Sequence, residues 1–156
     1  SAAYKLADAG LNVIVVERGE FPGSKNVMGG ILYKKPTEAI IPEFYKEAPL
    51  ERPIAEQRVY LLTDTAKIGL SYKNTRYLDD ITGYTVFRAK FDRWFAKKAE
   101  EKGALIITET VVEDLIIENN RVIGIKADRA NGDIFADVVI LAEGAHCLLA
   151  QKHGFQ

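Results

Sequence analysis

Two acidic residues stand at the ends of apolar runs, and a glycine follows each of them closely. Glu17 comes directly after Val13–Val16 and precedes Gly19, while Glu143 is followed by Gly144. A carboxylate accepts hydrogen bonds from hydroxyl groups, and in dinucleotide-binding βαβ units an acid at the tip of the second strand binds the ribose in this way. The solvated start of a loop has the same sequence, so both interpretations of these acids stay open.

The residues before Glu17 predict the elements that position it. Apolar residues at helical spacing within 2–7, followed by Gly10, predict a helix that ends in a left-handed residue. The β-branched run Val13–Val16 predicts a buried parallel strand. In such units the Gly-rich turn for the pyrophosphate lies about 20 residues before the acid, which places it ahead of Ser1. We therefore expect an N-terminally truncated fragment that lacks its first strand and Gly-rich turn.

Composition narrows the class of protein. The 156 residues are 47% hydrophobic, enough for a core, and 21 basic and 22 acidic residues give a net charge of -1, which argues against nucleic-acid binding. The single cysteine excludes an internal disulfide and a cysteine-clustered metal site, so no metal is expected, and a reducing compartment fits best. Charged residues interrupt every apolar run, so we expect no transmembrane segment, no signal peptide and a cytoplasmic location.

A long glycine-rich segment follows Glu17. Residues 18–30 contain four glycines and one proline, which predicts a loop rather than a regular element. The pair Gly29-Gly30 indicates either the close approach of a backbone or flat ligand, or a plain hinge, and both remain open. Lys35–Glu38 then predicts the entry to a short amphipathic helix over Ala39–Tyr45, limited by Pro42.

The middle of the chain changes to a period of two. Alternating apolar residues over 54–77, with a turn at Thr63–Ala66, predict a β-hairpin or the start of an antiparallel sheet. A strand over Thr82–Phe87 then leads to Arg88 and a helix that ends at Gly103. Trp94, at helical spacing with two phenylalanines, is predicted to lie in the core rather than to stack on a flavin.

The last third predicts a β-meander. A short buried strand at Leu105–Ile107 precedes period-two segments at 111–118, 122–127 and 134–135, joined by turns at Asn119-Asn120 and 131–133. The continuous run Val138–Leu141 predicts another buried parallel strand, followed by a final helical piece.

His146 and Cys147 have no third partner in sequence. They are therefore interpreted as a surface turn rather than a reactive pair. No role is assigned to His153.

This order of elements resembles the FAD-binding half of glutathione-reductase-like flavoproteins. Within that group the chain looks most similar to the FixC-type electron-transfer flavoprotein:quinone oxidoreductases and their relatives, the geranylgeranyl reductases. The segments that carry the resemblance are residues 15–19, the Pro22–Gly30 loop, Arg88 with Phe91 and Asp92, residues 111–113 and residues 136–145.

The resemblance implies an α/β fold of Rossmann-like, glutathione-reductase type with a β-meander and an antiparallel insert. It divides the chain into a first part of the FAD-binding domain (1–49), the start of an inserted substrate- or quinone-side layer (50–84) and a second part of the FAD-binding domain (85–156). The residues that it implies for cofactor binding are Glu17, Arg18, Lys25, Gly29, Gly30, Arg88, Val111, Val112, Glu143 and Gly144.

Each implied position has a chemical reason. Glu17 would bind the adenosine ribose, and the Val111-Val112 backbone would face the adenine edge. Arg88 would lie just ahead of its helix, near the pyrophosphate and ribityl chain, because a guanidinium suits an anionic phosphate. Glu143-Gly144 would close on the ribityl and phosphate region, and the loop to Gly30 would approach the isoalloxazine.

The implied activity is electron transfer through FAD, from a reduced electron-transfer flavoprotein to a quinone, with a link to nitrogen fixation. No side chain is expected to be catalytic, because the flavin performs the redox chemistry. The resemblance also allows a ferredoxin-like iron–sulfur partner and a peripheral position at a membrane. A prenyl reductase or flavin hydroxylase is the alternative enzyme. A cofactor-free fragment without activity is the other alternative, and we expect little or no FAD on residues 1–156 alone.

Overall fold

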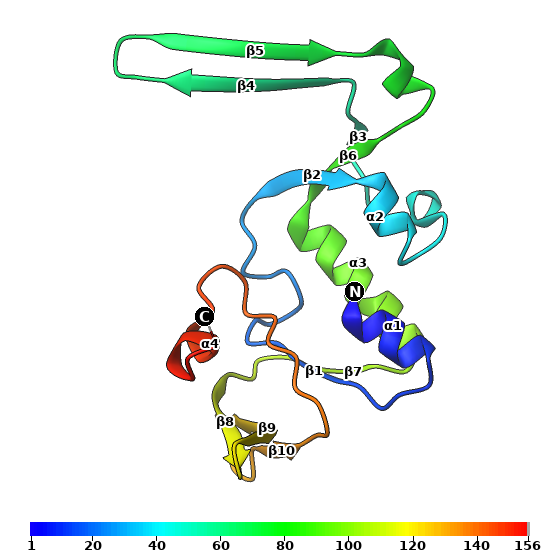
Figure 1. Ribbon diagram of the computed structural model, residues 1–156. Helices are drawn as coiled ribbons and strands as arrows, with labels where there is room; N and C mark the ends of the chain where they lie inside the picture. The colour runs from blue at the N-terminus through cyan, green and yellow to red at the C-terminus, as the bar shows by residue number, and fades with distance from the viewer. Residues whose placement is uncertain (156) are drawn as a thin grey trace. The chain divides into compact units, whose positions relative to one another are not determined.

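The computed structural model describes residues 1–155, and they form a mixed α/β fold, as the sequence predicts (Figure 1). The described chain divides into two compact units. The first unit contains residues 1–13 and 22–105, and the second contains residues 14–21 and the chain from 106 onward. The functional division at residues 49 and 84 stays a prediction.

The helices of the first unit are α1 (Ala2–Asp8), α2 (Lys34–Glu38) and α3 (Arg88–Glu101), with single 3-10 turns η1 (Phe44–Lys46) and η2 (Thr75–Leu78). Both glycine-terminated helices are confirmed, since Gly10 has a φ of 80° behind α1 and Gly103 a φ of 99° behind α3. The helix predicted over Ala39–Tyr45 is wrong. The helical residues lie earlier, in α2, because Pro36 is tolerated in a first turn and the Thr37 hydroxyl donates to the Tyr33 carbonyl at 3.0 Å.

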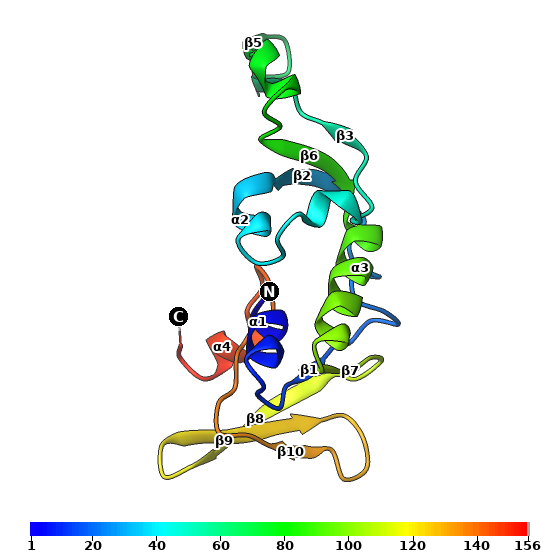
Figure 2. The same cartoon turned by 90° about the vertical axis from the view of Figure 1, so that its right-hand side faces the viewer.

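Two antiparallel sheets complete the first unit. One has the order β2-β6-β3 and is built from β2 (Gly29–Tyr33), β3 (Arg52–Pro53) and β6 (Gly83–Phe87). In it, β6 leads directly into α3 (Figure 2). The other sheet is the predicted hairpin of β4 (Glu56–Leu62) and β5 (Lys67–Lys73).

Gly29 and Gly30 open strand β2 instead of ending a loop. Gly29 pairs with Phe87 of β6, and a Cβ added to Gly29 would stand 3.3 Å from the Val86 carbonyl oxygen. The prediction of a loop up to Gly30 is therefore wrong, because the strand that orders it comes much later in the chain. Of the two interpretations of the pair, the close approach of another backbone is the one observed at Gly29.

The core of the first unit lies between α1, α3, the η1 region and β6. Its most buried side chain is Phe44, only 1% exposed, whose ring meets Tyr84 edge-on with centroids 6.3 Å apart. Trp94 packs partly buried against Phe91, at 5.5 Å between centroids. The prediction that Trp94 belongs to the core is confirmed.

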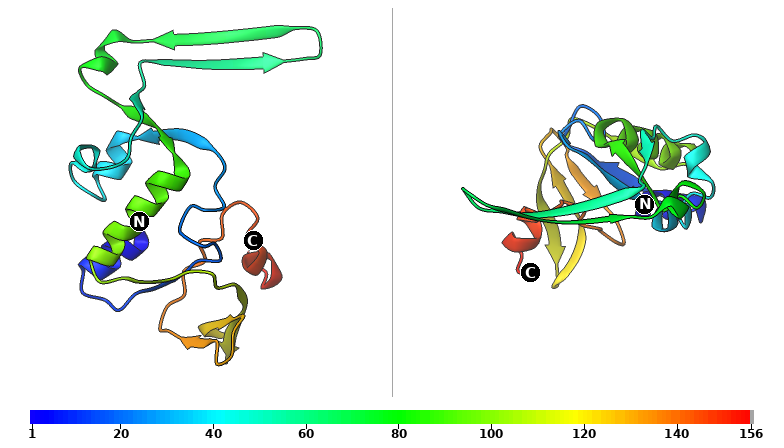
Figure 3. Two further views of the ribbon diagram at one scale, coloured as in Figure 1. Left: turned by 180° about the vertical axis from the view of Figure 1, so that it is seen from behind. Right: turned by 90° about the horizontal axis from the view of Figure 1, so that it is seen from above.

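The second unit carries the meander, with β8 (Val112–Glu118), β9 (Arg121–Ala127) and β10 (Asp133–Phe135) in the order β10-β9-β8 (Figure 3). Its tight turn has positive φ at Asn119 and Asn120, as predicted. The unit ends in α4 (Leu148–Lys152).

Strand β1 (Ile14–Val16) pairs with β7 (Leu105–Ile107). Leu105 N donates to Val13 O at 2.9 Å and Glu17 N donates to Ile107 O at 2.8 Å. Residue numbers therefore increase in the same direction along both strands, which makes the pair parallel. The prediction of a parallel strand here is confirmed, but its full burial is not, since Ile14 is 48% exposed.

The strand predicted over Val138–Leu141 is absent from the described structure. Val138 is 75% exposed and Ile140 is 56% exposed, and no strand within residues 1–155 pairs with this run. A continuous apolar run forms a buried strand only where neighbours supply hydrogen bonds and cover both faces. The prediction is wrong for this reason.

Candidate functional site

Glu17 lies where β1 ends, in the second unit. Its backbone is held on both sides, because its N–H donates to Ile107 O at 2.8 Å and its carbonyl accepts from Thr110 N at 3.0 Å. Its half-buried carboxylate accepts the Gly19 N–H at 2.6 Å through Oε1. Within residues 1–155 no group donates to Oε2, so a fixed carboxylate keeps one oxygen for a hydroxyl donor.

Thr110 connects Glu17 to the predicted adenine-side backbone. It is 2% exposed, its hydroxyl donates to Thr108 O at 2.9 Å, and that hydroxyl also accepts from the Arg129 guanidinium. The next residue, Val111, accepts from Asp128 N at 2.8 Å through its carbonyl. The structure therefore brings Glu17 and the start of the Val111-Val112 segment together within one unit.

Arg88 lies beside the start of β2 in the first unit. Arg88 is the first residue of α3 rather than a residue ahead of the helix, and its backbone N–H donates to Met28 O at 3.4 Å. Its guanidinium forms a bidentate pair with Asp92, with Nε to Oδ1 at 2.9 Å and Nη2 to Oδ2 at 3.0 Å. Hydrogen bonding to Asp92 raises the pKa of Arg88, and the side chain stays 49% exposed.

Three other predicted residues are less constrained. Arg18 and Lys25 are exposed, and within residues 1–155 no hydrogen bond or ion pair orients either side chain. Gly30 is half-buried, and no atom lies within 4 Å of the position that its Cβ would take. The structure offers space at Gly30 but no built partner for either cation.

Glu143 caps α4. Its Oε2 accepts from Leu149 N at 2.7 Å and its Oε1 accepts from Ala150 N at 3.1 Å. Gly144 has a φ of 80°, and its carbonyl accepts from the Cys147 thiol at 2.8 Å. His146 is exposed and Cys147 is half-buried at this turn, in agreement with the predicted surface turn. The capping bonds engage both Glu143 oxygens once each, and the role of Glu143-Gly144 toward a flavin stays a prediction.

One polar cluster was not foreseen from the sequence. Asp114 on β8 accepts from Lys152 Nζ at 2.7 Å and from its own neighbour Leu115 N at 2.9 Å, and lies 2.7 Å from His153 Nε2. The cluster joins α4 to the meander. Within residues 1–155 no group of three or more His, Cys, Asp or Glu side chains could hold a metal ion.

This cluster predicts a pH-dependent stability. Its hydrogen bonds, above all that from Lys152, hold the pKa of Asp114 well below its ordinary value of 3.8. Because a lowered folded-state pKa stabilises the folded form only while the group is ionised, the contribution is complete above pH 3.8 and is lost as the pH falls further. Asp114→Asn is expected to lower the melting temperature near neutrality, with the gap to wild type shrinking in acid. Asp137→Asn, at an exposed position of the same unit, is the control, and a gap independent of pH would contradict the prediction.

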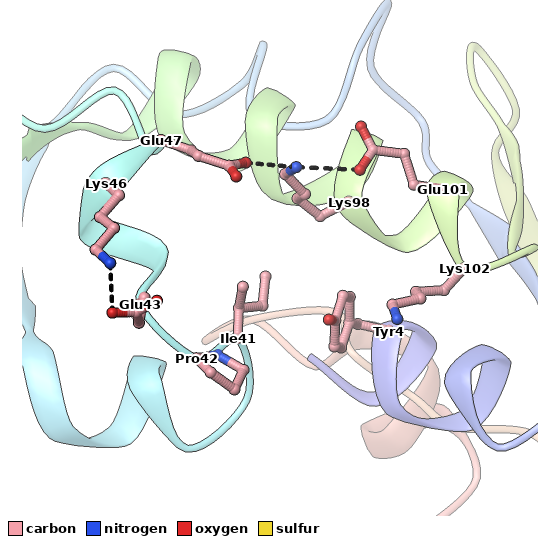
Figure 4. A pocket seen from close by; sticks show the side chains of 9 residues that line it. All are labelled: Tyr4, Ile41, Pro42, Glu43, Lys46, Glu47, Lys98, Glu101 and Lys102. Carbon is pink, nitrogen blue, oxygen red and sulfur yellow. Dashed lines mark hydrogen bonds and ion pairs between the residues drawn. The ribbon is translucent and has the colours of Figure 1, made fainter.

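A pocket of about 260 Å³ lies in the first unit between η1, α1 and the end of α3 (Figure 4). Its charged side chains pair with one another or with nearby acids. Lys98 Nζ lies 2.7 Å from Glu47 Oε2 and 3.1 Å from Glu101 Oε2, and Lys102 pairs with Asp8 at 2.7 Å. None of the predicted cofactor residues lines this pocket, and its charged side chains are already paired. We therefore place no cofactor there.

Among residues 1–155, none of the helices combines the length and the apolar character needed to cross a bilayer.

Known proteins resemble the chain along its entire length. It is 45% identical to protein FixC of Bradyrhizobium diazoefficiens over 158 residues, covering 100% of this chain and 36% of that protein. It is 49% identical to protein FixC of Azotobacter vinelandii over 156 residues, covering 99% of this chain and 36% of that protein. The chain thus spans 36% of the length of these relatives. No family model matches it.

Solved structures agree with the fold. A geranylgeranyl bacteriochlorophyll reductase-like protein from Thermoplasma acidophilum superposes with a TM-score of 0.76 at 25% identity, over 98% of this chain and 38% of that chain. A myxobacterial FAD-dependent halogenase superposes with a TM-score of 0.61 at 23% identity, over 85% of this chain and 31% of that chain, which shows the fold alone.

Proposed function

We propose that this chain forms part of the FAD-binding region of a flavoprotein oxidoreductase, since its own full length is similar to about a third of the length of proteins named FixC. The observation that carries the FAD assignment is the carboxylate of Glu17. One of its oxygens is fixed by Gly19 N at 2.6 Å, and the other is left for a hydroxyl donor such as the adenosine ribose. The residues described thus suit the group chemically.

The other predicted residues have complementary roles in this proposal. The Arg88 guanidinium faces the pyrophosphate and ribityl chain, where its charge and planar donors suit anionic oxygens. The Val111-Val112 backbone lies along the adenine edge. Gly29 fits closely against β6, and the open space at Gly30 lets a flat ring come close to this pair. Arg18, Lys25 and Glu143-Gly144 complete the set. FAD, when bound, supplies the redox chemistry, while these residues bind and orient it.

The whole protein is proposed to pass electrons from a reduced electron-transfer flavoprotein to a quinone, assisted by an iron–sulfur partner and placed at the periphery of a membrane. Support comes from identities of 41–49% with proteins named FixC. The test is anaerobic mixing of the FAD-loaded, full-length protein with reduced electron-transfer flavoprotein. The bound flavin should lose its visible absorbance, and a short-chain quinone should restore it. A flavin that stays oxidised would contradict the proposal.

The alternative function is a prenyl reductase. It is favoured by the TM-score of 0.76 with the geranylgeranyl bacteriochlorophyll reductase-like protein. Loss of a prenyl double bond, detected by mass spectrometry after incubation with the reduced protein, would support this alternative over quinone reduction. A visible spectrum of residues 1–156 tests separately whether they hold FAD unaided.

In the full-length protein, Arg88→Ala is expected to weaken FAD binding by about tenfold, or ~1.4 kcal/mol. It should also reduce the salt dependence of FAD binding. The effect is limited because Arg88 is half-exposed and already paired with Asp92. Arg88→Lys should recover only part of the affinity, since lysine keeps the charge but loses the planar fork. Fluorescence titration of flavin measures both. Lys97→Ala, exposed on the same helix, is the control, and equal affinities for wild type and Arg88→Ala would refute the assignment.

A further inference from the structure

The segment that precedes β2, residues 22–28, is here called the glycine-rich loop, and its first turn packs tightly on the first turn of α3. Gly23 has a φ of 93°, which a residue with a side chain rarely adopts. A Cβ at this position would lie 2.8 Å from Asp92 Cβ and 3.2 Å from both Ala89 Cα and Arg88 O. The turn can approach the helix this closely only because residue 23 is glycine.

Asp92 connects this turn to the cation of α3. Its Oδ2 accepts from Asn26 Nδ2 at 2.6 Å and from Arg88 Nη2 at 3.0 Å, while Oδ1 accepts from Arg88 Nε at 2.9 Å. The Asp92 side chain is only 18% exposed. The turn is closed from within as well, because Asn26 N donates to Gly23 O at 2.9 Å. A single carboxylate therefore joins the loop and the guanidinium.

The pairing orients Arg88 without exhausting its donors. A guanidinium has five N–H donors in a fixed plane, and Asp92 engages Nε and Nη2. Nη1 has no partner within residues 1–155, and the side chain is half-exposed. Such a fork loses less conformational entropy on binding an anion than a free arginine would, because its orientation is already set.

We propose that Asp92 is a positioning residue that fixes the glycine-rich loop and the Arg88 guanidinium in one arrangement for binding the anionic part of a dinucleotide. That Asp92 fixes the loop follows from the contacts of Gly23 and Asn26 alone. That this arrangement serves to bind a dinucleotide rests on the proposed function.

Removing the charge of Asp92 should change FAD affinity in opposite directions, depending on whether Asp92 positions Arg88 or merely lies near it. A carboxylate close to Arg88 repels a pyrophosphate, so a bystander Asp92 would oppose binding, and Asp92→Asn would tighten it. A positioning Asp92 has the opposite effect. Its loss frees the guanidinium and the loop, and binding weakens although a negative charge has been removed. The sign of the change in affinity therefore decides between the two roles.

The experiment compares Asp92→Asn and Asp92→Ala with wild type in the full-length protein, with two measurements. Hydrogen exchange over residues 22–30, followed without flavin, should become roughly tenfold faster in both variants, because the loop loses its anchor. FAD affinity should fall roughly 5- to 10-fold. In an Arg88→Ala background, Asp92→Ala should cause a clearly smaller further loss of affinity, since the two residues act as a pair.

Glu100→Gln, at an exposed acid of the same helix, should change neither measurement. Unchanged hydrogen exchange, or tighter FAD binding by Asp92→Asn, would overturn the inference. A loss of affinity equally large with and without Arg88 would also overturn it. Failure of the proposed function looks different, because then wild type itself would not bind FAD while the hydrogen-exchange result would still hold.

Discussion

Replacing Phe44 with alanine is expected to lower the free energy of unfolding by about 3–5 kcal/mol. Phe44 is 1% exposed and touches two aromatic rings edge-on, Tyr45 at 5.9 Å and Tyr84 at 6.3 Å between centroids. Truncation removes these contacts and leaves a cavity that the packed neighbours fill only in part. Denaturant unfolding of wild type and variant measures the loss directly.

The matched control is Phe135→Ala. Phe135 is 65% exposed on β10, so its truncation should change the free energy of unfolding by no more than about 0.5 kcal/mol. Equal losses at the two positions would show that the cluster around Phe44 is not the core of the first unit. Phe44 also supports the proposed FAD-binding residue Arg88 indirectly. Its ring packs on Tyr84 of β6, and β6 leads directly to Arg88.

Elements whose evidence is local could be predicted from the sequence. The helix that begins at Arg88 has its own apolar face and its own terminal glycine, and the hairpin carries both strands and the turn within one stretch. Strand β2 could not be predicted in the same way. Its two glycines read as a loop, and only pairing with the distant β6 orders them. The strand predicted over Val138–Leu141 was wrong for the converse reason. An apolar run forms a buried strand only where a neighbouring strand pairs with it, and none does so within residues 1–155.

In the candidate site, too, features with a local sequence pattern could be predicted, and contacts between distant residues could not. Glu17 could be proposed from the sequence because an acid at the end of a strand is a local pattern, and its role toward a ribose stays a prediction. The pairing of Arg88 with Asp92 was also within reach, since oppositely charged residues four apart on a helix are neighbours. The contacts of Asp92 with Asn26 and of Asp114 with His153 join residues 66 and 39 positions apart, and no local pattern indicates them. Sequence thus identified single residues, while folding determined which of them act together.

Glu17→Ala is expected to weaken FAD binding by the full-length protein by about 10- to 150-fold, or roughly 1.5–3 kcal/mol for hydrogen bonds to a charged group. The half-buried carboxylate is held by Gly19 N at 2.6 Å, so its free oxygen is in place before a ribose hydroxyl arrives. Alanine removes the acceptor altogether. Fluorescence titration with FAD, at the same ionic strength for every variant, gives the change in affinity.

Two further variants separate ribose binding from loop structure. Glu17→Gln retains one acceptor oxygen, which can keep the bond to Gly19 N while an amide replaces the second oxygen. If Glu17 binds the ribose, Glu17→Gln should therefore preserve the melting temperature of the flavin-free protein yet still lose most of the affinity. Glu20→Ala, at an exposed acid three residues on, should alter neither quantity. Full affinity in Glu17→Ala would mean that Glu17 only anchors the loop start through Gly19, and that the ribose is bound elsewhere.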